Sequence, residues 1–434
     1  MKRRRFLETA AGVALSPLVA AAARGASDRV VVAVMGLNGR GTVLARGFAR
    51  AVNAEIAYLC DVDAQVLVTA AAALAEAQPQ ARAPKTVGDF RRALDDKNVD
   101  ALVIAAPDHW HAPAAILAMQ AGKHVYLEKP GSHNPREAEL VAAAAAKHRR
   151  AVQLGTQQRS TARSREVVQA VREGLIGRPY LARAWYANTR ATIGRGNAAP
   201  VPPHLDYELW QGPAPRAPYR DNVIHYNWHW FRRWGTGEIC NNGTHELDVC
   251  RWALGVDYPV RVVSTGGRYH FQDDWEFPDT QEATFEFDGG KTIIWQGQSC
   301  NGARTHGRSR GVLVLGTSGS VVLDRDGFVV YDLKDQVVKE SVAPRRTDGV
   351  NVSADDDATG VHIANFVDAV RTGARLHQPV EEGGKSALLG HLGNIAQITG
   401  RALRTDPASG RIVDDAEAMR LWQREYAPAW APAV

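Results

Sequence analysis

An apolar run followed by a glycine-rich turn is the feature that most constrains the fold of this chain. Residues 30–35 read Val-Val-Val-Ala-Val-Met, which is typical of a strand buried on both faces of a parallel sheet. The turn that follows contains Gly36, Asn38, Gly39, Arg40 and Gly41 and leads into a helical pattern. Asn tolerates left-handed backbone, so Asn38 can stand where the glycine template has its middle glycine. The helix start presents free N–H groups to a pyrophosphate, so the segment predicts a dinucleotide-binding strand, turn and helix.

An acid at the end of the second predicted strand supports this interpretation. The strand over 55–60 ends at Asp61, 25 residues after Gly36. A carboxylate near this spacing binds the adenosine ribose diol and repels the 2′-phosphate of NADP. We therefore expect NAD as the cofactor. The alternative is a plain glycine loop, but here the strand, the helix and the acid occur together.

Strands and helices continue to alternate up to residue 155. A strand over 100–105 leads into Pro107 and His111, with Asp108 as a possible helix cap. Another short strand, over 124–127, ends in Glu128-Lys129-Pro130, where the proline stops it. With a helix over 135–147 and a last strand over 152–154, the pattern predicts a six-stranded, doubly wound α/β domain over residues 28–155. A lysine at the carboxyl end of an inner strand points into the crevice where such sheets bind ligands.

Four motifs in this order resemble the Gfo/Idh/MocA oxidoreductases, the family of glucose–fructose oxidoreductase and inositol dehydrogenase. They are the glycine turn, Pro107-x-x-x-His111, Glu128-Lys129-Pro130 and Gly243-Thr244-His245-Glu246-Leu247-Asp248. The resemblance implies that an N-terminal Rossmann domain is followed, over 156–434, by an α+β domain with a large, mainly antiparallel open sheet. It also implies a small carbohydrate substrate, cofactor contacts from Pro107, His111, Glu128 and Lys129, and a homo-oligomer, either dimer or tetramer.

The pattern after residue 156 is consistent with such a domain. Gly289-Gly290 and Ser318-Gly319 predict hairpin turns between alternating runs. The predicted strands cover 180–186, 260–264, 282–287, 292–296, 312–315, 320–323 and 328–331. The predicted helices cover 160–172, 241–254, 360–371 and 384–403, and the resemblance implies that the last two pack at the domain interface.

Two segments are candidates for the substrate site. The stretch 188–222 is a long loop rich in Gly, Pro and Arg, and such loops are usually functional. Residues 225–234 hold five aromatic rings, two histidines and two arginines, which suit the apolar faces and hydroxyl groups of sugars; an aromatic core cluster is the alternative. The predicted substrate-binding residues are Gln157, Arg159, Tyr186, His229, Trp230, Arg232, Asn241 and His245.

Hydride transfer from a secondary alcohol needs a base for the hydroxyl proton and a donor for the developing alkoxide. Lys129 is the predicted donor, because desolvation lowers the pKa of a buried lysine. His245 is the predicted base if the resemblance holds, and a structural histidine otherwise. The family commonly has Asp four residues before this histidine, where this chain has Asn241. The expected substitutes for that acid are Glu238, His229 and Asp248, the last within reach along a helix.

Charge and cysteine patterns argue against other classes of protein. The formal net charge is +5, but residues 1–23 hold four basic side chains and one acid, which leaves +2 for the remainder. This charge does not indicate nucleic-acid binding. Cys60, Cys240, Cys250 and Cys300 have no C-x-x-C or His/Cys spacing, so we expect no metal site. Cys60 lies in a strand pattern and is expected to be a buried thiol.

The first 26 residues read as an export signal. Arg3-Arg4-Arg5-Phe6-Leu7 matches the twin-arginine pattern, and a weakly apolar run follows that is too short for a membrane span. A basic N-terminal helix is the alternative. Because twin-arginine cargo folds before export, we expect a periplasmic protein that carries its cofactor with it.

Three functions are compatible with this sequence. The first is an NAD-dependent sugar or polyol dehydrogenase, or a non-dissociating oxidoreductase. The second is an NAD-dependent glycosidase or lyase that oxidises, eliminates and reduces again, as some relatives of this family do. Export favours a tightly held cofactor, which supports the non-dissociating oxidoreductase and the glycosidase. The third, a sugar-binding protein without turnover, is disfavoured by Lys129 and His245.

Overall fold

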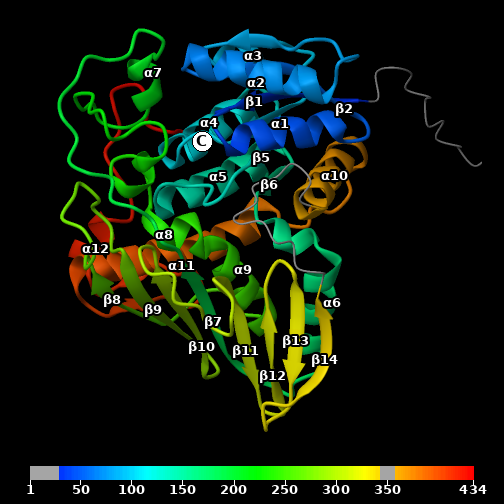
Figure 1. The fold of residues 1–434 in the computed structure, drawn as a ribbon, viewed down its shortest axis with the longest axis vertical. Helices are drawn as coiled ribbons and strands as arrows, with labels where there is room; N and C mark the ends of the chain where they lie inside the picture. The colour runs from blue at the N-terminus through cyan, green and yellow to red at the C-terminus, as the bar shows by residue number, and fades with distance from the viewer. Residues whose placement is uncertain (1–28, 343–356) are drawn as a thin grey trace, which may run out of the picture.

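The computed structural model describes residues 29–342 and 357–434; the predicted export signal lies outside these residues. Figure 1 shows a small sheet with its helices in the upper half of the molecule and a larger sheet in the lower half. Among the helices described, none combines the length and apolar character needed to cross a bilayer.

The small sheet is parallel and has the order β3-β2-β1-β4-β5-β6. This order is that of a doubly wound Rossmann domain, as predicted. Its inner strands are buried along most of their length because helices cover both faces. The strand missing from the sequence interpretation is β3, which is short and partly exposed. The strands are β1 Val30–Met35, β2 Ala54–Cys60, β3 Lys85–Val87, β4 Ala101–Ile104, β5 His124–Leu127 and β6 Val152–Leu154. The helices are α1 Arg40–Arg50, α2 Ala64–Ala77, α3 Arg91–Leu94, α4 Asp108–Gln120 and α5 Pro135–His148.

The large sheet has ten strands in the order β14-β13-β12-β11-β7-β10-β9-β8-β15-β16. Its strand pairs are antiparallel except for β7 with β10, and both predicted hairpin turns are confirmed. The strands are β7 Pro179–Ala187, β8 Arg261–Gly267, β9 Thr280–Phe287, β10 Lys291–Gln298, β11 Arg310–Gly316, β12 Gly319–Leu323, β13 Gly327–Tyr331, β14 Val337–Val342, β15 Leu403–Thr405 and β16 Ile412–Val413.

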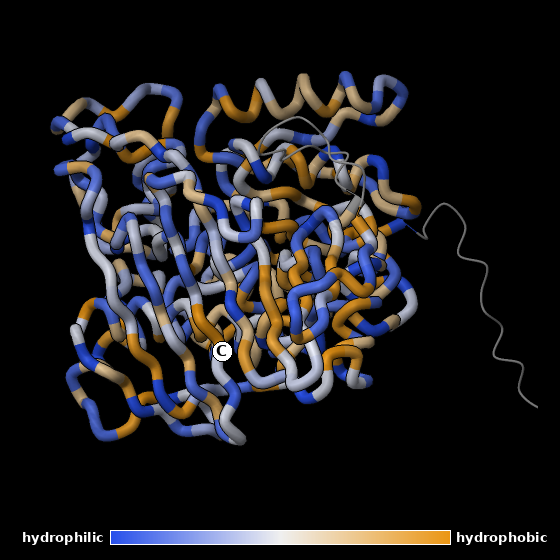
Figure 2. The backbone as a smooth tube through the Cα atoms, turned by 60° about the horizontal axis from the view of Figure 1, so that its bottom comes forward, coloured by the Kyte–Doolittle hydropathy of each residue, from blue (hydrophilic) through white to orange (hydrophobic). Residues whose placement is uncertain are grey.

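Side chains alternate along these strands between a helix-covered face and an open face. In β9, Ala283, Phe285 and Phe287 are buried, while Thr284 and Glu286 between them are partly exposed. Figure 2 shows this as alternating apolar and polar stretches along the extended segments. The buried face packs against α9 Gly243–Leu254 and α11 Val380–Thr399 and forms the main core of the second domain.

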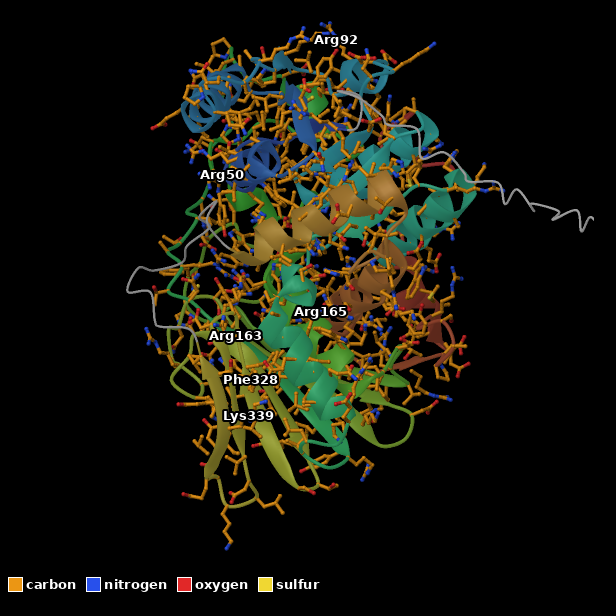
Figure 3. All side chains as sticks on the ribbon, turned by 90° about the vertical axis from the view of Figure 1, so that its right-hand side faces the viewer. Arg50, Arg92, Arg163, Arg165, Phe328 and Lys339 are labelled. Atoms are coloured by element: carbon orange, nitrogen blue, oxygen red, sulfur yellow. The ribbon has the colours of Figure 1, made fainter. Side chains whose placement is uncertain are left out.

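The remaining helices connect the two sheets. The helix α10 Asp357–Thr372 packs on the Rossmann domain, where the Phe366 ring meets Phe48 and Tyr126 edge to face, and α11 packs on α5. Both therefore lie at the domain interface, as expected. Figure 3 shows α6 Ala162–Arg172 beside the strands that carry Phe328 and Lys339, and the Lys339 ammonium lies 2.9 Å from Glu166. The shorter helices are η1 Gln157–Ser160, α7 Tyr207–Gln211, η2 Asn227–Trp230, α8 Gly237–Asn241 and α12 Ala416–Arg420.

Two helix predictions need correction. The predicted helix over 241–254 is two helices, α8 and α9, which meet at Asn242. The predicted helix over 384–403 begins earlier and stops at Thr399, because Gly400 adopts a left-handed backbone (φ 65°). Leu403 instead begins strand β15.

Candidate active site

A cavity of about 450 Å³ lies where the carboxyl ends of the Rossmann strands face the second domain. We call it the cleft. The residues that line it come from the glycine turn, the ends of β2, β4 and β5, the segment 209–229, the α8–α9 junction and the β11–β13 region. This position is the ligand crevice of doubly wound sheets.

The backbone of the glycine turn leaves no room for a side chain at Gly36 or Gly41. Gly36 has a φ of 80°, and a Cβ atom there would lie 2.5 Å from the Ala106 nitrogen. A Cβ atom on Gly41 would lie 1.6 Å from the Gly36 oxygen. Asn38, Gly39 and Arg40 line the cleft together with Gly36, whereas Gly41 does not and instead lets α1 approach the turn. Packing requires a glycine at position 41, and its predicted cofactor contact stays a prediction.

Asp61 lies at the carboxyl end of β2 and lines the cleft. Its Oδ2 accepts a hydrogen bond from the Leu37 N–H at 2.7 Å, and its Oδ1 accepts one from Asp63 at 3.0 Å. Burial raises the pKa of Asp61 above its ordinary value. The turn, the start of α1 and this carboxylate have the arrangement that fits a dinucleotide: donors for a pyrophosphate and an acceptor for a ribose diol.

Glu128 and Arg40 form an ion pair on the wall of the cleft. The Arg40 Nε donates to Glu128 Oε1 at 2.7 Å, and the Gln157 amide donates to the same oxygen at 3.3 Å. Burial alone would raise the pKa of Glu128, but the charges of Arg40 and Lys129 outweigh it and lower the pKa. Glu128 therefore stays ionised and orients both Arg40 and Gln157.

Pro107 and His111 also line the cleft. The His111 Nε2 lies 2.9 Å from the Ala106 carbonyl oxygen, and its Nδ1 accepts the Gly131 N–H at 3.3 Å. Burial lowers the pKa of His111 to about 4. This histidine is neutral at physiological pH and ties the β4 loop to the loop after β5.

Lys129 reaches across the cleft to the second domain. Its Nζ donates to Asn241 Oδ1 at 3.0 Å, and its peptide bond to Pro130 is cis. Burial lowers the pKa of Lys129 below that of a free lysine. Asn241, which replaces the expected Asp, thus holds the lysine with a neutral oxygen.

His245 lies near the start of α9 and lines the cleft together with Lys129. Its backbone N–H donates to the Asn242 carbonyl at 3.2 Å. Burial, followed by the charges of Arg325, Lys129 and Arg310, holds the pKa of His245 well below its usual range. The imidazole is therefore neutral, and its nitrogens are available as a hydrogen-bond donor and an acceptor.

The three groups expected to substitute for the missing acid, two carboxylates and one histidine, each have another partner in the structure. Arg159 forms a buried bidentate ion pair with Asp248, in which its Nε and Nη2 donate to the two carboxylate oxygens at 2.7 and 2.8 Å. Glu238 accepts from Arg190 at 2.8 Å. The His229 Nδ1 lies 2.6 Å from the Tyr226 carbonyl oxygen.

Asp108 is a residue of the cleft that the sequence interpretation treated only as a helix cap. Pro107 occupies the cap position, and the Asp108 carboxylate accepts from the Thr236 hydroxyl at 2.5 Å. Burial raises the pKa of Asp108 to about 7, against the opposing charge of Lys129. Asp108 is thus a second titratable group beside Lys129 on this wall of the cleft.

The structure divides the predicted substrate residues into two groups. Gln157, His229, Asn241 and His245 line the cleft. The other four do not, because packing or ion pairs hold them elsewhere; these are Arg159, Tyr186, Trp230 and Arg232.

Each of these four has a specific partner outside the cleft. The Arg159 guanidinium lies 4.7 Å from the Trp252 ring centroid while it binds Asp248. The Tyr186 hydroxyl accepts from Asn188 at 2.6 Å.

Trp230 stacks on Trp275 with ring centroids 3.8 Å apart. Arg232 lies at the surface, where its backbone N–H donates to Glu276. The aromatic segment 225–234 is therefore divided: Tyr226, Trp228 and His229 line the cleft, and Trp230 is core.

Several lining residues carried no recognisable sequence signal. Trp210 comes from the long loop, where loop length was the only indication. His225 belongs to the segment 225–234, which was predicted as a whole, but His225 itself was not singled out. Asn242, Arg310 and Arg325 reach the cleft from the α8–α9 junction, from β11 and from the turn after β12. Strand patterns do not distinguish such arginines from ordinary surface charges.

The segment 204–234 is fastened to the Rossmann domain beside the cleft. The His225 Nε2 lies 2.9 Å from Asp63 Oδ2, two residues after Asp61. The Trp110 indole donates to the Trp210 carbonyl at 3.0 Å, and the His109 N–H donates to the Trp234 carbonyl at 3.1 Å. These bonds hold Leu209, Trp210 and His225 in the lining near Asp61.

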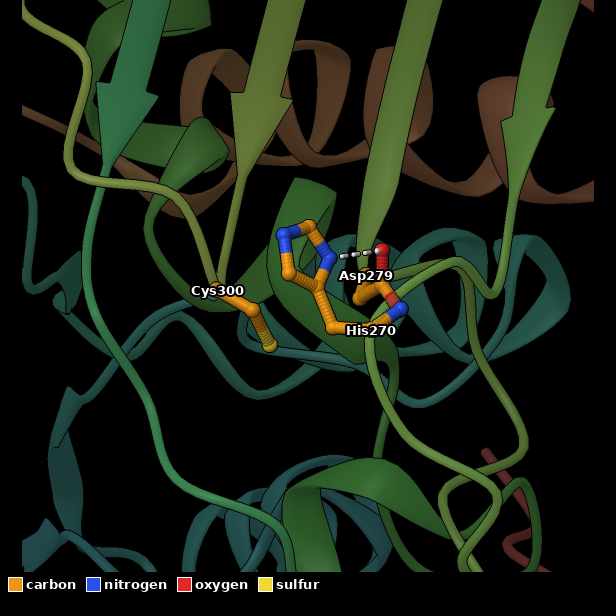
Figure 4. Close-up of side chains that lie close together, drawn as sticks. All are labelled: His270, Asp279 and Cys300. Atoms are coloured by element: carbon orange, nitrogen blue, oxygen red, sulfur yellow. Dashed lines mark hydrogen bonds and ion pairs between the residues drawn. The ribbon is translucent and has the colours of Figure 1, made fainter.

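One His, Asp and Cys group, formed by His270, Asp279 and Cys300, has its ligand atoms within 4.8 Å of one another (Figure 4). None of the three lines the cleft. The Asp279 carboxylate accepts from the Tyr269 N–H at 2.8 Å, and the Arg268 guanidinium lies 3.5 Å from it. Because a guanidinium already shares this carboxylate, we assign the group a structural role.

Comparison with known proteins agrees with this geometry. Residues 30–156 match the GFO_IDH_MocA profile, described as "Oxidoreductase family, NAD-binding Rossmann fold". Residues 162–315 match its C-terminal alpha/beta domain.

Individual relatives cover different parts of the chain. A "Glycosyl hydrolase family 109 protein" of Stenotrophomonas maltophilia is 38% identical over 135 residues, 30% of this chain and 29% of that one. An "Inositol 2-dehydrogenase" of Rubrobacter xylanophilus is 30% identical over 167 residues, 38% of this chain and 46% of that one. These matches thus span less than half of either relative. The solved aldose-aldose oxidoreductase of Caulobacter crescentus has the same fold, with a TM-score of 0.65, 20% identity and coverage of 87% of this chain and 99% of that one.

Proposed function

The chain belongs to the Gfo/Idh/MocA oxidoreductase family, and from this premise we propose that it oxidises a secondary hydroxyl of a sugar, polyol or glycoside. The observation that carries the proposal is the convergence of Lys129 and His245, from different domains, on the cleft that also contains the glycine turn and Asp61. A dinucleotide fold alone would not indicate this chemistry, but a lysine and a neutral histidine at one cavity do.

The N-terminal domain is an NAD-binding Rossmann domain. When bound, NAD supplies the acceptor for the substrate hydride. The turn from Gly36 to Arg40 would hold its pyrophosphate, and Asp61 would hold the adenosine ribose diol.

Two side chains act on the substrate hydroxyl in this proposal. Lys129 donates a hydrogen bond to the oxygen as negative charge develops, and Asn241 keeps the ammonium in place at 3.0 Å. His245 accepts the hydroxyl proton as a neutral imidazole. Since its neighbours Arg325, Lys129 and Arg310 are cations, the imidazolium is destabilised and His245 would have to pass the proton on. Asp108, whose pKa is raised to about 7, also lines the cleft.

We further propose that the cofactor stays bound between turnovers. The bonds of His225 to Asp63 and of Trp110 to Trp210 hold a second-domain segment beside the predicted ribose site. Release of the dinucleotide would require these contacts to open. Retention also suits the proposed periplasmic location, where free NAD is scarce, and the twin-arginine motif at residues 3–7 motivates that location.

A second candidate function is an NAD-dependent glycosidase or lyase. The specific observation is the aligned glycosyl hydrolase family 109 relative. The same cleft would oxidise the sugar transiently, and elimination of the leaving group would follow before the sugar is reduced again.

One experiment separates the functions. Purified protein is denatured, and its supernatant is searched for NAD(H) by mass spectrometry. Intact protein is then incubated with sugars, polyols and glycosides, with and without added NAD. Net oxidised sugar supports the dehydrogenase, and released aglycone without net oxidation supports the glycosidase. Absence of both products, with sugar binding retained, would contradict both.

The open face of the large sheet supports a homo-oligomer. Leu313, Arg183 and Ile294 lie side by side across β11, β7 and β10, on the face opposite Ala184 and Trp295. Leu315 and Leu181 form the next pair along this face. The aliphatic side chains around Arg183 on this face suit contact with a second copy. We expect light scattering to give the mass of a dimer or tetramer, and a monomer at micromolar concentration would contradict this.

A further inference from the structure

We propose that Glu238 is a positioning residue for the oxidation: it holds the side-chain amide of Asn241 with its oxygen towards Lys129, and so keeps the ammonium in place for the substrate hydroxyl. This inference rests on the proposed oxidoreductase function and adds to it a residue that lies behind the cleft. Glu238 does not line the cleft. It therefore acts through Asn241 and takes no part in a chemical step itself.

Glu238 is a buried acid whose two oxygens accept hydrogen bonds from four side chains. It lies in α8 and is 5% exposed. Its Oε2 accepts from the Arg190 Nε at 2.8 Å and from the Ser299 hydroxyl at 3.0 Å. Its Oε1 accepts from the amide nitrogens of Asn241 at 3.4 Å and Asn242 at 2.5 Å. All four partners are N–H or O–H donors, as a buried ionised carboxylate requires.

The two asparagines beside Glu238 share one arrangement, with a cation on one side and the acid on the other. The Asn241 Oδ1 accepts from the Lys129 Nζ at 3.0 Å, and the Asn242 Oδ1 accepts from the Arg310 Nη1 at 3.3 Å. The two ends of an amide have nearly the same shape, so its partners decide where the oxygen lies. Because a cation can only donate and a carboxylate can only accept, Glu238 fixes each amide with its oxygen towards the cation.

This orientation matters because the side chain of Asn241 has no charge of its own. An aspartate at this position would have two equivalent acceptor oxygens and would accept from Lys129 in either orientation. An asparagine has one acceptor, and its turned form would present an N–H donor to the ammonium. Glu238 supplies what the amide lacks, a fixed orientation and a negative charge behind it. Burial lowers the pKa of Lys129, and Glu238 is among the acids whose charges oppose this effect.

A separate connection joins Glu238 to an aromatic residue of the cleft. The Arg190 Nη1 donates to the Tyr226 hydroxyl at 2.8 Å, while its Nε donates to Glu238. Tyr226 lines the cleft. An effect that passed through Arg190 would change substrate binding and hence KM, whereas an effect that passes through Asn241 changes Lys129 and hence kcat.

The first test replaces the carboxylate by an amide of similar shape. In Glu238→Gln, we expect kcat to fall about tenfold with KM nearly unchanged, the loss of one charge-assisted hydrogen bond. The alkaline limb of kcat/KM should move to lower pH, because the Lys129 ammonium loses a nearby negative charge. Lys129 should also react faster with acetic anhydride at a given pH, because more of it is the neutral amine. Mass spectrometry reads this labelling, which needs no substrate.

Two double variants show whether the effect passes through Asn241. In the Asn241→Ala background, Glu238→Gln should change the labelling of Lys129 by less than about twofold, because the amide through which it acts is absent. In the Asn241→Asp background, Glu238→Gln should keep the kcat of the wild type. The carboxylate at position 241 then accepts from Lys129 in either orientation, so no positioning acid is needed.

The matched control is Glu382→Gln. Glu382 pairs with the buried side chain of Arg251 at 2.7 Å and does not line the cleft. The variant removes the same charge from a similar ion pair, and its kcat, pH profile and Lys129 labelling should equal those of the wild type. If Glu238→Gln alone does not fold, Arg190→Gln/Glu238→Gln is compared with Arg190→Gln. This comparison removes the same carboxylate without leaving a buried guanidinium unpaired.

The outcomes distinguish this inference from the function on which it rests. A folded Glu238→Gln protein with the kcat, pH profile and labelling of the wild type would overturn the positioning role. So would a rise in KM alone, which would assign Glu238 to the Tyr226 connection, or an equally large effect in the Asn241→Ala background. If the wild type oxidises no sugar, polyol or glycoside, the oxidoreductase function fails, while the labelling still decides whether Glu238 controls Lys129.

Discussion

Asn241→Asp should move the pH dependence of the reaction to higher pH. The variant places a carboxylate where a neutral amide oxygen now lies 3.0 Å from the Lys129 ammonium. A carboxylate stabilises the charged lysine, so the pKa of Lys129 rises. Lys129 acts as a charged donor in the proposed reaction, so the alkaline limb of kcat/KM, where the ammonium loses its proton, shifts to higher pH by the same amount.

The size of the shift follows from the geometry. At an effective dielectric of about 20, unit charges 3.0 Å apart attract by about 5 to 6 kcal/mol. At about 1.4 kcal/mol per pKa unit, the ceiling is about four units. Two effects reduce it: the new carboxylate loses solvation, and it lies close to Glu238, to which the Asn241 amide now donates at 3.4 Å. We therefore expect a shift of about one to three units.

Two measurements check this prediction. The first is the pH profile of kcat/KM, followed by NADH absorbance with the best substrate of the panel. The second needs no substrate: the rate at which acetic anhydride modifies Lys129 at different pH values, read by mass spectrometry, because only the neutral amine reacts. Asn241→Ala is the control, since it removes the acceptor without adding charge. A folded Asn241→Asp protein with an unchanged profile and unchanged labelling would refute the coupling of these two residues.

Three further predictions concern the cofactor, the catalytic pair and export. Asp61→Ala should relax the discrimination against NADP; equal affinity of the wild type for NAD and NADP, measured by calorimetry, would contradict the role of Asp61. Lys129→Met and His245→Ala should each lower kcat/KM by on the order of a hundredfold, and the double variant should be scarcely worse because both act on one hydroxyl; near-full activity of either single variant would return it to a structural role. Replacing Arg3 and Arg4 by Lys should leave folded protein in the cytoplasm, as cell fractionation would show, and unchanged periplasmic recovery would exclude the twin-arginine route.

Features that depend on local spacing could be predicted from the sequence. Three such features are the glycine turn, Asp61 and the strand end at Glu128-Lys129-Pro130. Each lies within a single strand–turn–helix unit, where the backbone geometry of a few residues determines the position of the side chain. The two hairpins of the large sheet were predicted for the same reason, because Gly-Gly and Ser-Gly pairs favour tight turns. Short or exposed elements such as β3 and β15 were missed, since their few residues carry little periodicity.

Only the tertiary structure decided which partners the charged side chains of the second domain take. Arg159 was predicted to bind substrate, but Asp248, 89 residues further along the chain, binds it in the interior. Because Arg159 binds Asp248, this carboxylate does not serve as the partner that was expected for His245.

By contrast, Arg310 and Arg325 were not predicted as site residues, because neither belongs to a recognisable motif. The order of the strands in the ten-stranded sheet brings both to the cleft. Buried charge must find an opposite charge or a hydrogen bond wherever the fold provides one. That choice depends on contacts between residues far apart in sequence. Local patterns therefore predicted the glycine turn, Lys129 and His245, and long-range packing decided which charged side chains of the second domain reach the cleft.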